Sequence, residues 1–294
     1  MLRTLWQFSR PHTLIGSTLS IVALYSLASA NRVFDPSLLG WSLLAALACN
    51  IYITGLNQWA DVAVDRINKP WLPIPAGRLS RNQAGWIVVI ALLIALASSA
   101  WVSWPFLGLV CLIAAIGTAY SLPPFHLKRH HGWAAGAITL VRGVLVNLGF
   151  FLHFQYQLEG GWDLPVFIWP LVGFVAAFSM GIAWFKDIPD TAGDAQFQYG
   201  TLAVQQGRNP AFRLGVVVVS LAYAGVIGAA LAGWLPSALF FVCTHTLLLG
   251  TFLYMAWRLN VQDDRAVKRF YLFFWGLFFV EYVVYPLGFI LEAA

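Results

Sequence analysis

The chain has 294 residues, of which 60% are hydrophobic and only 10% are charged. A soluble domain carries about 25% charged residues, so the composition excludes a soluble globular protein and predicts a polytopic membrane protein. The net charge of +5 indicates membrane topology and affinity for anions. Nucleic-acid binding is excluded because no basic run with interleaved aromatic residues lies outside the loops.

Apolar runs of about 20 residues are long enough to cross a bilayer as helices. They predict nine spans, near residues 13–30, 37–59, 83–103, 105–122, 133–154, 165–185, 211–232, 236–257 and 270–291. The predicted fold class is therefore an all-α membrane bundle. Residues 1–294 are expected to form a single transmembrane domain.

Basic residues concentrate before the first span and in the loops after the second, fourth, sixth and eighth spans, whereas the opposite loops hold only Arg32 and lean acidic. The positive-inside rule places the N-terminus in the cytoplasm or its topological equivalent and the C-terminus across the membrane. A signal peptide cleaved behind Ala28-Ser-Ala30 is the less favoured alternative.

Arg10 and His12 lie just before the first predicted span. A positive-inside anchor and a polar residue at headgroup level explain them as well as binding of an acidic substrate does. Both interpretations stay open at this point.

Asn57, Asp61 and Asp65 close the second span and are spaced four residues apart. On an α-helix four residues turn about 400° and rise about 6 Å, so the three side chains are predicted to climb one face. Hard oxygen ligands in one stripe suit Mg²⁺, which also takes water and substrate phosphate oxygens. The alternative is a solvated helix end.

The loop that follows contains Pro70, Pro73 and Pro75 and carries cations at both ends. A continuous helix is excluded here because proline removes a backbone donor and clashes with the preceding turn. A stiff, cationic loop beside an acidic helix end would suit a lid over a diphosphate, but an ordinary connector fits equally well. Ser80 is the predicted N-cap of the third span.

The fourth span ends between Tyr120 and Lys128, where Pro123 and Pro124 break the helix. This break brings both residues to the predicted level of the aspartates. Lys128 is interpreted as a phosphate ligand, with a topology signal as the alternative. The nearby histidines lack further ligands for a metal site and are interpreted as loop residues.

Arg142 lies in the middle of the fifth span. A lone Arg there costs about 2.5–3.5 kcal/mol on insertion scales, so we expect it to face the bundle interior and a negative partner. An aspartate cluster or a bound diphosphate would serve. A structural pair with Glu281 in the ninth span is the alternative.

A second acidic cluster, Asp187, Asp190 and Asp194, closes the sixth span. Pro189 and Gly193 argue against a regular helix throughout, so these carboxylates are predicted to lie on a helix end that runs into a turn. Two acidic groups at the mouths of apolar helices imply a shared cation and an anionic ligand. The predicted chemistry is Mg²⁺-assisted departure of diphosphate from an allylic carbon, followed by capture of the carbocation.

These motifs, together with the segment from Tyr120 to Lys128, resemble the UbiA superfamily of intramembrane prenyltransferases. The resemblance runs essentially end to end. Arg10-Pro-His-Thr13 and Phe185-Lys-Asp-Ile-Pro-Asp190 narrow it to the homogentisate prenyltransferases of tocopherol synthesis.

The resemblance implies a ring of nine helices with the active site at the cytoplasmic end of a lipid-open tunnel. It implies that metal and diphosphate are bound by Asn57, Asp61, Asp65, Asp187, Asp190 and Asp194. It also implies that phosphate oxygens are neutralised by Lys128, Arg142, Arg66 and Lys69. Tyr120 would assist ionisation or shield the cation, and Arg10 or His12 would bind the acceptor's carboxylate.

The expected reaction is transfer of a prenyl group, by resemblance phytyl, from its diphosphate to homogentisate with decarboxylation, which gives a 2-methyl-6-prenyl-1,4-benzoquinol. The expected partners are Mg²⁺, the two substrates and membrane lipid, with no nucleic acid and no obligate protein partner. Chlorophyllide or 4-hydroxybenzoate as acceptor is the alternative within the superfamily. A transporter would instead show polar groups at the midplane of discontinuous helices. A non-catalytic lipid-binding protein has no need of paired aspartate motifs.

Overall fold

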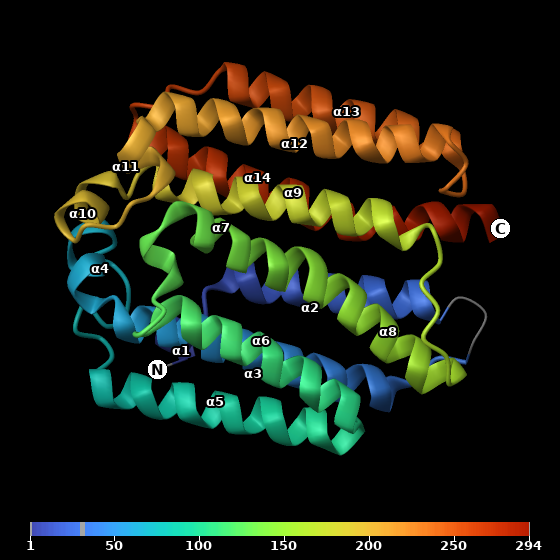
Figure 1. Ribbon diagram of the computed structural model, residues 1–294, viewed down its shortest axis with the longest axis horizontal. Coiled ribbons are helices and arrows are strands. Elements are labelled where there is room, and N and C mark those ends of the chain that lie inside the picture. The colour runs from blue at the N-terminus through green and yellow to red at the C-terminus, as the bar shows by residue number, and fades with distance from the viewer. Residues whose placement is uncertain (1, 30–32, 294) are drawn as a thin grey trace. The chain divides into compact units, whose positions relative to one another are not determined.

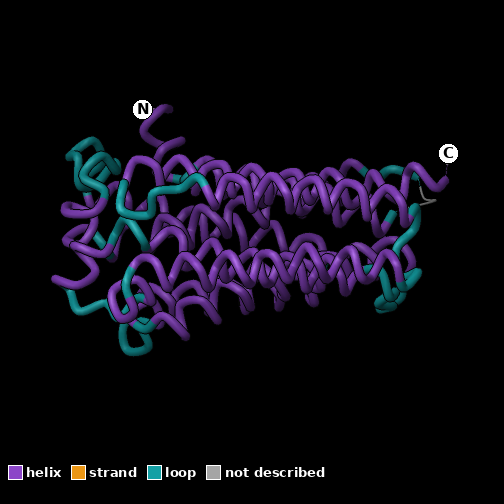
Figure 2. The backbone as a smooth tube through the Cα atoms, turned by 90° about the horizontal axis from the view of Figure 1, so that it is seen from above, coloured by secondary structure: helices purple, strands orange, loops and turns teal. Residues whose placement is uncertain are grey.

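The computed structural model describes residues 2–29 and 33–293; Ala30 and Arg32, used above for the first span and the topology, lie outside the described residues. Within these ranges all regular elements are helices, and the only extended pairing is an isolated bridge between His130 and Gly200. Figure 2 shows this helical backbone with connecting loops and no strand. The all-α prediction is confirmed.

The described part of the chain contains nine helices long and apolar enough to cross a membrane, as the sequence predicted. Eight of these nine are single helices, and six of the eight are α2 (Pro11–Ala28), α5 (Arg81–Val102), α6 (Trp104–Ser121), α9 (Ile168–Asp187), α12 (Arg208–Leu231) and α13 (Ala238–Trp257). The second and ninth spans are α3 (Pro36–Ala60) and α14 (Asp264–Ala293). The fifth is composite, built from α7 (His131–Ile138), the π-helix η2 (Thr139–Leu145) and α8 (Val146–Glu159).

Short helices follow or precede the spans at the loops that carry the polar motifs. They are α1 (Leu2–Phe8), α4 (Val62–Asn68), the 3-10 helix η1 (Leu127–Arg129), α10 (Thr191–Gln196) and α11 (Leu202–Gln206). Figure 1 labels the α-helices in chain order.

The chain divides into two compact units. Unit 1 comprises Met1–Val22, Val33–Ala137 and Ala192–Gly200; unit 2 comprises Ala23–Arg32, Ile138–Thr191 and Thr201–Ala294. Each is described by itself below. A single domain over residues 1–294 stays a prediction.

In unit 1, α3 packs along α5 and α6. Close approach depends on small residues: a Cβ at Gly117 would lie 2.6 Å from the side chain of Ile53. The hydroxyls of Tyr52 and Thr118 share a hydrogen bond of 2.6 Å between α3 and α6. Ser80 caps α5 as predicted, since its hydroxyl accepts from the Gln83 backbone while the Gln83 side chain accepts from the Ser80 backbone.

In unit 2, α9 packs against α12, α14 and η2. Aromatic side chains fill this contact. The rings of Phe178 and Phe274 stack with centroids 4.4 Å apart, and both side chains are fully buried. Gly143 in η2 lies very close to α9: a Cβ on it would lie 2.6 Å from the Ala176 Cα. Only glycine fits at this position because it has no side chain.

The prediction that one helix carries Asn57, Asp61 and Asp65 is wrong at its middle residue. Helix α3 ends at Ala60, and Asp61 has φ −97° and ψ 15°, which lies outside the helical region. Its backbone N–H still donates to the Asn57 carbonyl at 3.0 Å, and its carbonyl accepts from Asp65 at 2.8 Å. The stripe therefore bends at Asp61 without losing these hydrogen bonds.

Candidate active site

Asp61 is the centre of a polar cluster in unit 1. Its Oδ1 accepts a hydrogen bond from Lys128 Nζ at 2.5 Å and another from the Tyr199 hydroxyl at 3.1 Å. The Lys128 side chain is only 5% exposed and that of Asp61 is 12% exposed. A buried lysine requires an anionic partner, so the prediction that Lys128 reaches the level of the aspartates is confirmed by this ion pair.

The backbone after α6 delivers Lys128 to this position. Helix α6 ends at Ser121 before the two prolines, and His126 adopts a left-handed conformation with φ 43°. The chain then turns back through η1, where Lys128 lies. Beyond it, Gly200 donates to the Arg129 carbonyl and accepts from the His131 backbone, at 2.8 and 3.0 Å.

Asn68 connects the first acidic motif to the second. Its Nδ2 donates to Asp194 Oδ1 at 3.1 Å, and its Oδ1 accepts from the Gly193 backbone at 3.0 Å. A Cβ at Gly193 would lie 2.4 Å from Asn68 Oδ1, so only glycine leaves room for this contact. Helix α4 is thereby held to Gly193 and Asp194, in the part of α10 that belongs to unit 1.

Three motif aspartates are buried: Asp65 is 4% exposed, Asp190 is 4% exposed and Asp194 is 5% exposed. Burying carboxylates in their charged form is costly unless cations compensate them. Within unit 1, Asp61, Asp65 and Asp194 supply hard oxygen donors, a set that fits a divalent cation of the Mg²⁺ type. Among the described residues no three His, Cys, Asp or Glu side chains already converge on one point, so the ligand set stays a prediction.

Asp187 and Asp190 belong to unit 2. Helix α9 ends at Asp187, whose Oδ1 lies 3.4 Å from Lys186 Nζ, and Asp190 donates its backbone N–H to the Asp187 carbonyl at 3.2 Å. The predicted helix end is confirmed. Asp194, predicted in a turn, lies instead on the six-residue helix α10, which begins after Pro189 and accommodates Gly193.

Arg142 lies in unit 2 on the π-helix η2. Among the residues that the structure describes, no aspartate pairs with Arg142: the guanidinium lies over the rings of Trp275 and Phe278, at 4.6 and 5.7 Å from their centroids. A bound diphosphate, the other expected negative partner, stays a prediction. Arg142 Nη1 is buried and makes no hydrogen bond to any described residue. The alternative pair with Glu281 is wrong, because Glu281 binds His245 Nε2 at 3.1 Å. Cation–π contact replaces the ion pair.

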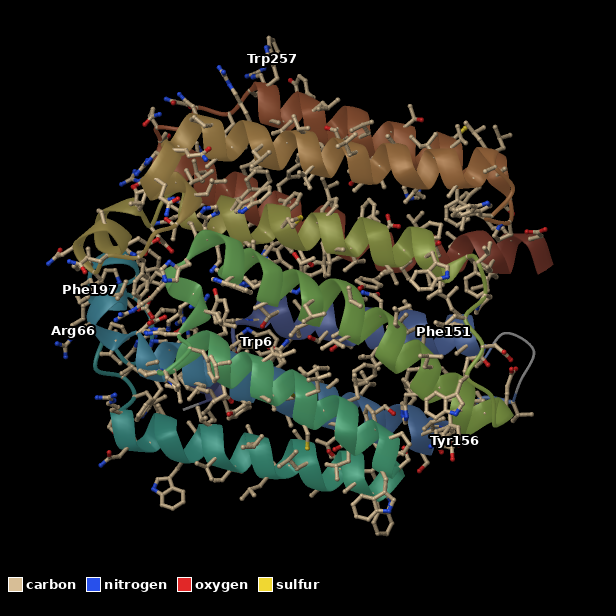
Figure 3. The ribbon with its side chains drawn as sticks, viewed as in Figure 1. Trp6, Arg66, Phe151, Tyr156, Phe197 and Trp257 are labelled. Carbon is tan, nitrogen blue, oxygen red and sulfur yellow. The ribbon has the colours of Figure 1, made fainter. Side chains whose placement is uncertain are left out.

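Four further predicted residues also lie in unit 1. Asn57 is half-buried in the last turn of α3, and Tyr120 lies in the last turn of α6. Lys69 is the C-cap of α4. Arg66 is exposed, and Figure 3 shows its side chain pointing away from the ribbon.

Arg10 and His12 are half-buried at the junction of α1 and α2. Arg10 has φ 52°, a left-handed conformation that is uncommon outside glycine. The junction is held to α3 because Gln58 Nε2 donates to the Phe8 carbonyl at 2.5 Å. The side chain of Arg10 forms no hydrogen bond or ion pair with the described residues.

Two loop residues of the cluster have shifted pKa values. Burial, and then the neighbouring Asp61 carboxylate, raises the pKa of the Tyr199 hydroxyl, so this group stays protonated and acts as a donor. Partial burial, followed by the charges of Lys128 and Arg129, lowers the pKa of His126. Both shifts favour neutral side chains beside the Asp61–Lys128 pair.

Sequence reasoning missed Tyr199, Asn68 and Gln58. Asn68 follows Asp65 by three residues and shares its helix face, a signal that was present in the spacing. Tyr199 is one of many aromatic residues of the chain, and Gln58 lies next to the more conspicuous Asn57, so neither stands out in the sequence.

A family model described as the UbiA prenyltransferase family matches residues 18–278. The chain is 41% identical to a homogentisate phytyltransferase of Synechocystis sp., over 98% of this chain and 96% of the relative. It is 36% identical to a homogentisate geranylgeranyltransferase of Triticum aestivum, over 97% of this chain and 72% of the relative.

Solved structures share the fold at low sequence identity. A UbiA homologue from Aeropyrum pernix aligns with TM-score 0.71 at 19% identity, over 97% of this chain and 98% of that one. A UbiA homologue from Archaeoglobus fulgidus, solved with GPP and Mg²⁺, aligns with TM-score 0.68 at 16% identity, over 99% of this chain and all of that one (100%).

Proposed function

The chain belongs to the UbiA prenyltransferase family, and from this premise we propose that it transfers a prenyl group from its diphosphate to homogentisate with loss of CO₂. The allylic C–O bond breaks and its electron pair leaves with the diphosphate. A ring carbon bonds to the prenyl carbon and loses its proton. The acetate arm loses CO₂ and gains a proton, which leaves a methyl group on the benzoquinol product.

The observation that carries this proposal is the buried Asp61–Lys128 pair beside the buried carboxylates Asp65 and Asp194. Lys128 supplies a positive charge for the phosphate oxygens, and the carboxylates supply ligands for a divalent cation. Asp61, Asp65 and Asp194 would hold Mg²⁺, which would supply positive charge to stabilise the diphosphate as it leaves. The Mg²⁺ and GPP bound to the Archaeoglobus homologue support this assignment.

We assign the remaining polar residues by the same premise. The metal ligands are Asn57, Asp61, Asp65, Asp187, Asp190 and Asp194. Arg142, Arg66 and Lys69 are assigned to the diphosphate, and Tyr120 assists ionisation. Arg142 is the best supported of the three cations, because its buried Nη1 has no hydrogen-bond partner among the described residues.

Arg10 and His12 are the proposed partners of the acceptor's carboxylate. Support comes from the half-buried position of both residues and from the Gln58 hydrogen bond that fixes the α1–α2 junction on the helix carrying Asn57. An Arg10→Ala variant is expected to raise the KM for homogentisate while the KM for the prenyl diphosphate stays within about twofold. An unchanged KM for homogentisate would remove Arg10 from the site.

The protein is an integral multi-pass membrane protein. We propose that the N-terminus and the site lie on the cytoplasmic side of a plasma or thylakoid membrane, supported by the basic loops. A cysteine placed at exposed Arg66 in a cysteine-free variant should react with a membrane-impermeant thiol reagent in inverted vesicles and stay protected in right-side-out vesicles. The reverse pattern would overturn the orientation.

The reaction is tested with membranes that contain the protein, Mg²⁺ and homogentisate labelled at the carboxyl or on the ring. Phytyl, geranylgeranyl and solanesyl diphosphate are supplied in separate reactions. The expected result is a ring-labelled prenylquinol with matching release of labelled CO₂, abolished by EDTA and by Asp61→Ala. Product from chlorophyllide or 4-hydroxybenzoate but not from homogentisate would overturn the acceptor assignment.

A further inference from the structure

Tyr199 lies outside both acidic motifs, and the proposed reaction gives it no role. Its hydroxyl donates to Asp61 Oδ1 at 3.1 Å, and the same oxygen accepts from Lys128 at 2.5 Å. The second oxygen, Oδ2, makes no hydrogen bond to any residue that the structure describes. Two donors on one oxygen fix the rotation of the carboxylate and leave the other oxygen for a cation.

The backbone around Tyr199 is held at three points. Tyr199 donates its N–H to the Asp194 carbonyl at 2.7 Å, so the residue is attached directly to the second acidic motif. The next residue, Gly200, donates its N–H to the Arg129 carbonyl at 2.8 Å, and its carbonyl accepts from the His131 N–H at 3.0 Å. One short segment thus contacts the Asp61 side chain, the Asp194 backbone and the segment that carries Lys128.

The Tyr199 ring is also fixed. The residue is 9% exposed. The centroids of the Tyr199 and His126 rings lie 5.9 Å apart in an edge-to-face arrangement, and the Arg129 guanidinium lies 5.9 Å from the Tyr199 centroid. A hydroxyl held on a rigid backbone and a packed ring loses little entropy when it orients a ligand. Hydrogen-bond donors that contact a metal-binding carboxylate fix its orientation.

We propose that Tyr199 is a positioning residue of the metal–diphosphate site: it turns Asp61 so that Oδ2 faces the cation, and it links Asp61 to the second acidic motif through Asp194. This inference rests on the proposed function for the identity of the ligand, and its geometry lies entirely within unit 1. Tyr199 does not touch the reacting carbon in this account and acts only through Asp61.

The test is Mn²⁺ binding to the full-length protein in detergent, followed by the electron paramagnetic resonance of free Mn²⁺, with inorganic diphosphate present and no prenyl donor or acceptor. Tyr199→Phe removes one hydroxyl and is expected to weaken Mn²⁺ half-saturation about 10- to 100-fold. Tyr52→Phe is the matched control, because it removes a hydroxyl of a buried tyrosine in unit 1 whose hydrogen-bond partner among the described residues is Thr118, away from Asp61. That control should stay within about twofold of the unsubstituted protein.

A double-mutant cycle with Asp61→Asn separates positioning from a general structural effect. If Tyr199 acts through Asp61, Tyr199→Phe causes no further weakening in the Asp61→Asn background. Unchanged Mn²⁺ binding in Tyr199→Phe, or a full additional loss in the double variant, would overturn the proposal. Mn²⁺ binding with the expected Tyr199 effect, but no product from homogentisate, would overturn the acceptor assignment and leave the positioning role intact.

Discussion

Each of the two units is held together internally, and the kind of contact differs between them. Unit 1 uses polar side chains that join distant segments: Lys128 to Asp61, and Asn68 to Asp194. Unit 2 has a continuous aromatic core around Phe178, Phe274 and Phe185, whose rings pack at centroid distances of 4.4 to 5.0 Å. Directional bonds fix ligand geometry, whereas aromatic burial mainly supplies stability. Substitutions in the aromatic core of unit 2 should therefore change stability, and substitutions in the unit 1 cluster should change activity.

The largest effect is expected from Phe178→Ala in unit 2. The side chain is fully buried, and its removal leaves a cavity beside Phe274, so the free energy of unfolding should fall by about 3–5 kcal/mol. Thermal unfolding in detergent measures this loss. Activity per folded molecule should stay within about threefold, and a much larger loss of activity at full folding would contradict the division of roles.

Asp61→Asn should produce the next largest effect, on activity. The substitution keeps the shape but removes the charge that Lys128 and a cation share, so kcat/KM should fall at least about 100-fold, or about 2.7 kcal/mol. The measurement is prenylquinol formation at saturating Mg²⁺. Exposed Asp163 provides the matched control as Asp163→Asn, and equal activity of the two variants would show that Asp61 has no special role.

Gly193→Ala should have an intermediate effect. The new Cβ would lie 2.4 Å from Asn68 Oδ1 and displace the contact between α4 and α10, so kcat/KM should fall about tenfold. Gly136→Ala is the control, because a Cβ there meets nothing within 4 Å and the helical glycine lies in the same unit. Asn68→Ala should mimic Gly193→Ala, and the double variant should be no worse than either single one.

The smallest effect is expected from Ser80→Ala. It removes the capping box at the start of α5 and should lower the free energy of unfolding by about 1 kcal/mol. The polar cluster is untouched, so kcat/KM should stay unchanged. A drop in kcat/KM comparable with that of Gly193→Ala would show that a loss of stability at α5 also disturbs the polar cluster around Asp61.

Periodicity and composition were sufficient for the helices but not for the bends between them. The nine spans follow from apolar runs, and the start of α5 follows from Ser80. The break at Asp61 depends on the dihedral angles of a single residue, whose side chain is held by Lys128 and Tyr199 from distant segments. No local pattern encodes those contacts.

The charged residues of the site could be predicted because charged residues are rare in this chain. In a chain with only 10% charged residues, Asp61 and Lys128 stand out, and the structure pairs them. Arg142 also stood out, but its partners are the faces of Trp275 and Phe278. Aromatic residues are so common in this chain that the sequence does not distinguish those two from packing or lipid-facing residues.

Asp61 and the buried acids Asp65 and Asp194 of unit 1 are proposed to hold a metal–diphosphate group. The most direct measurement is equilibrium binding of radiolabelled geranyl diphosphate to the purified protein without acceptor, with Mg²⁺ or with EDTA, for the unsubstituted protein, Asp61→Asn and Asp163→Asn. The account predicts saturable binding that requires Mg²⁺, survives Asp163→Asn and is lost in Asp61→Asn. Equal binding in EDTA, or undiminished Mg²⁺-dependent binding by Asp61→Asn, would contradict it.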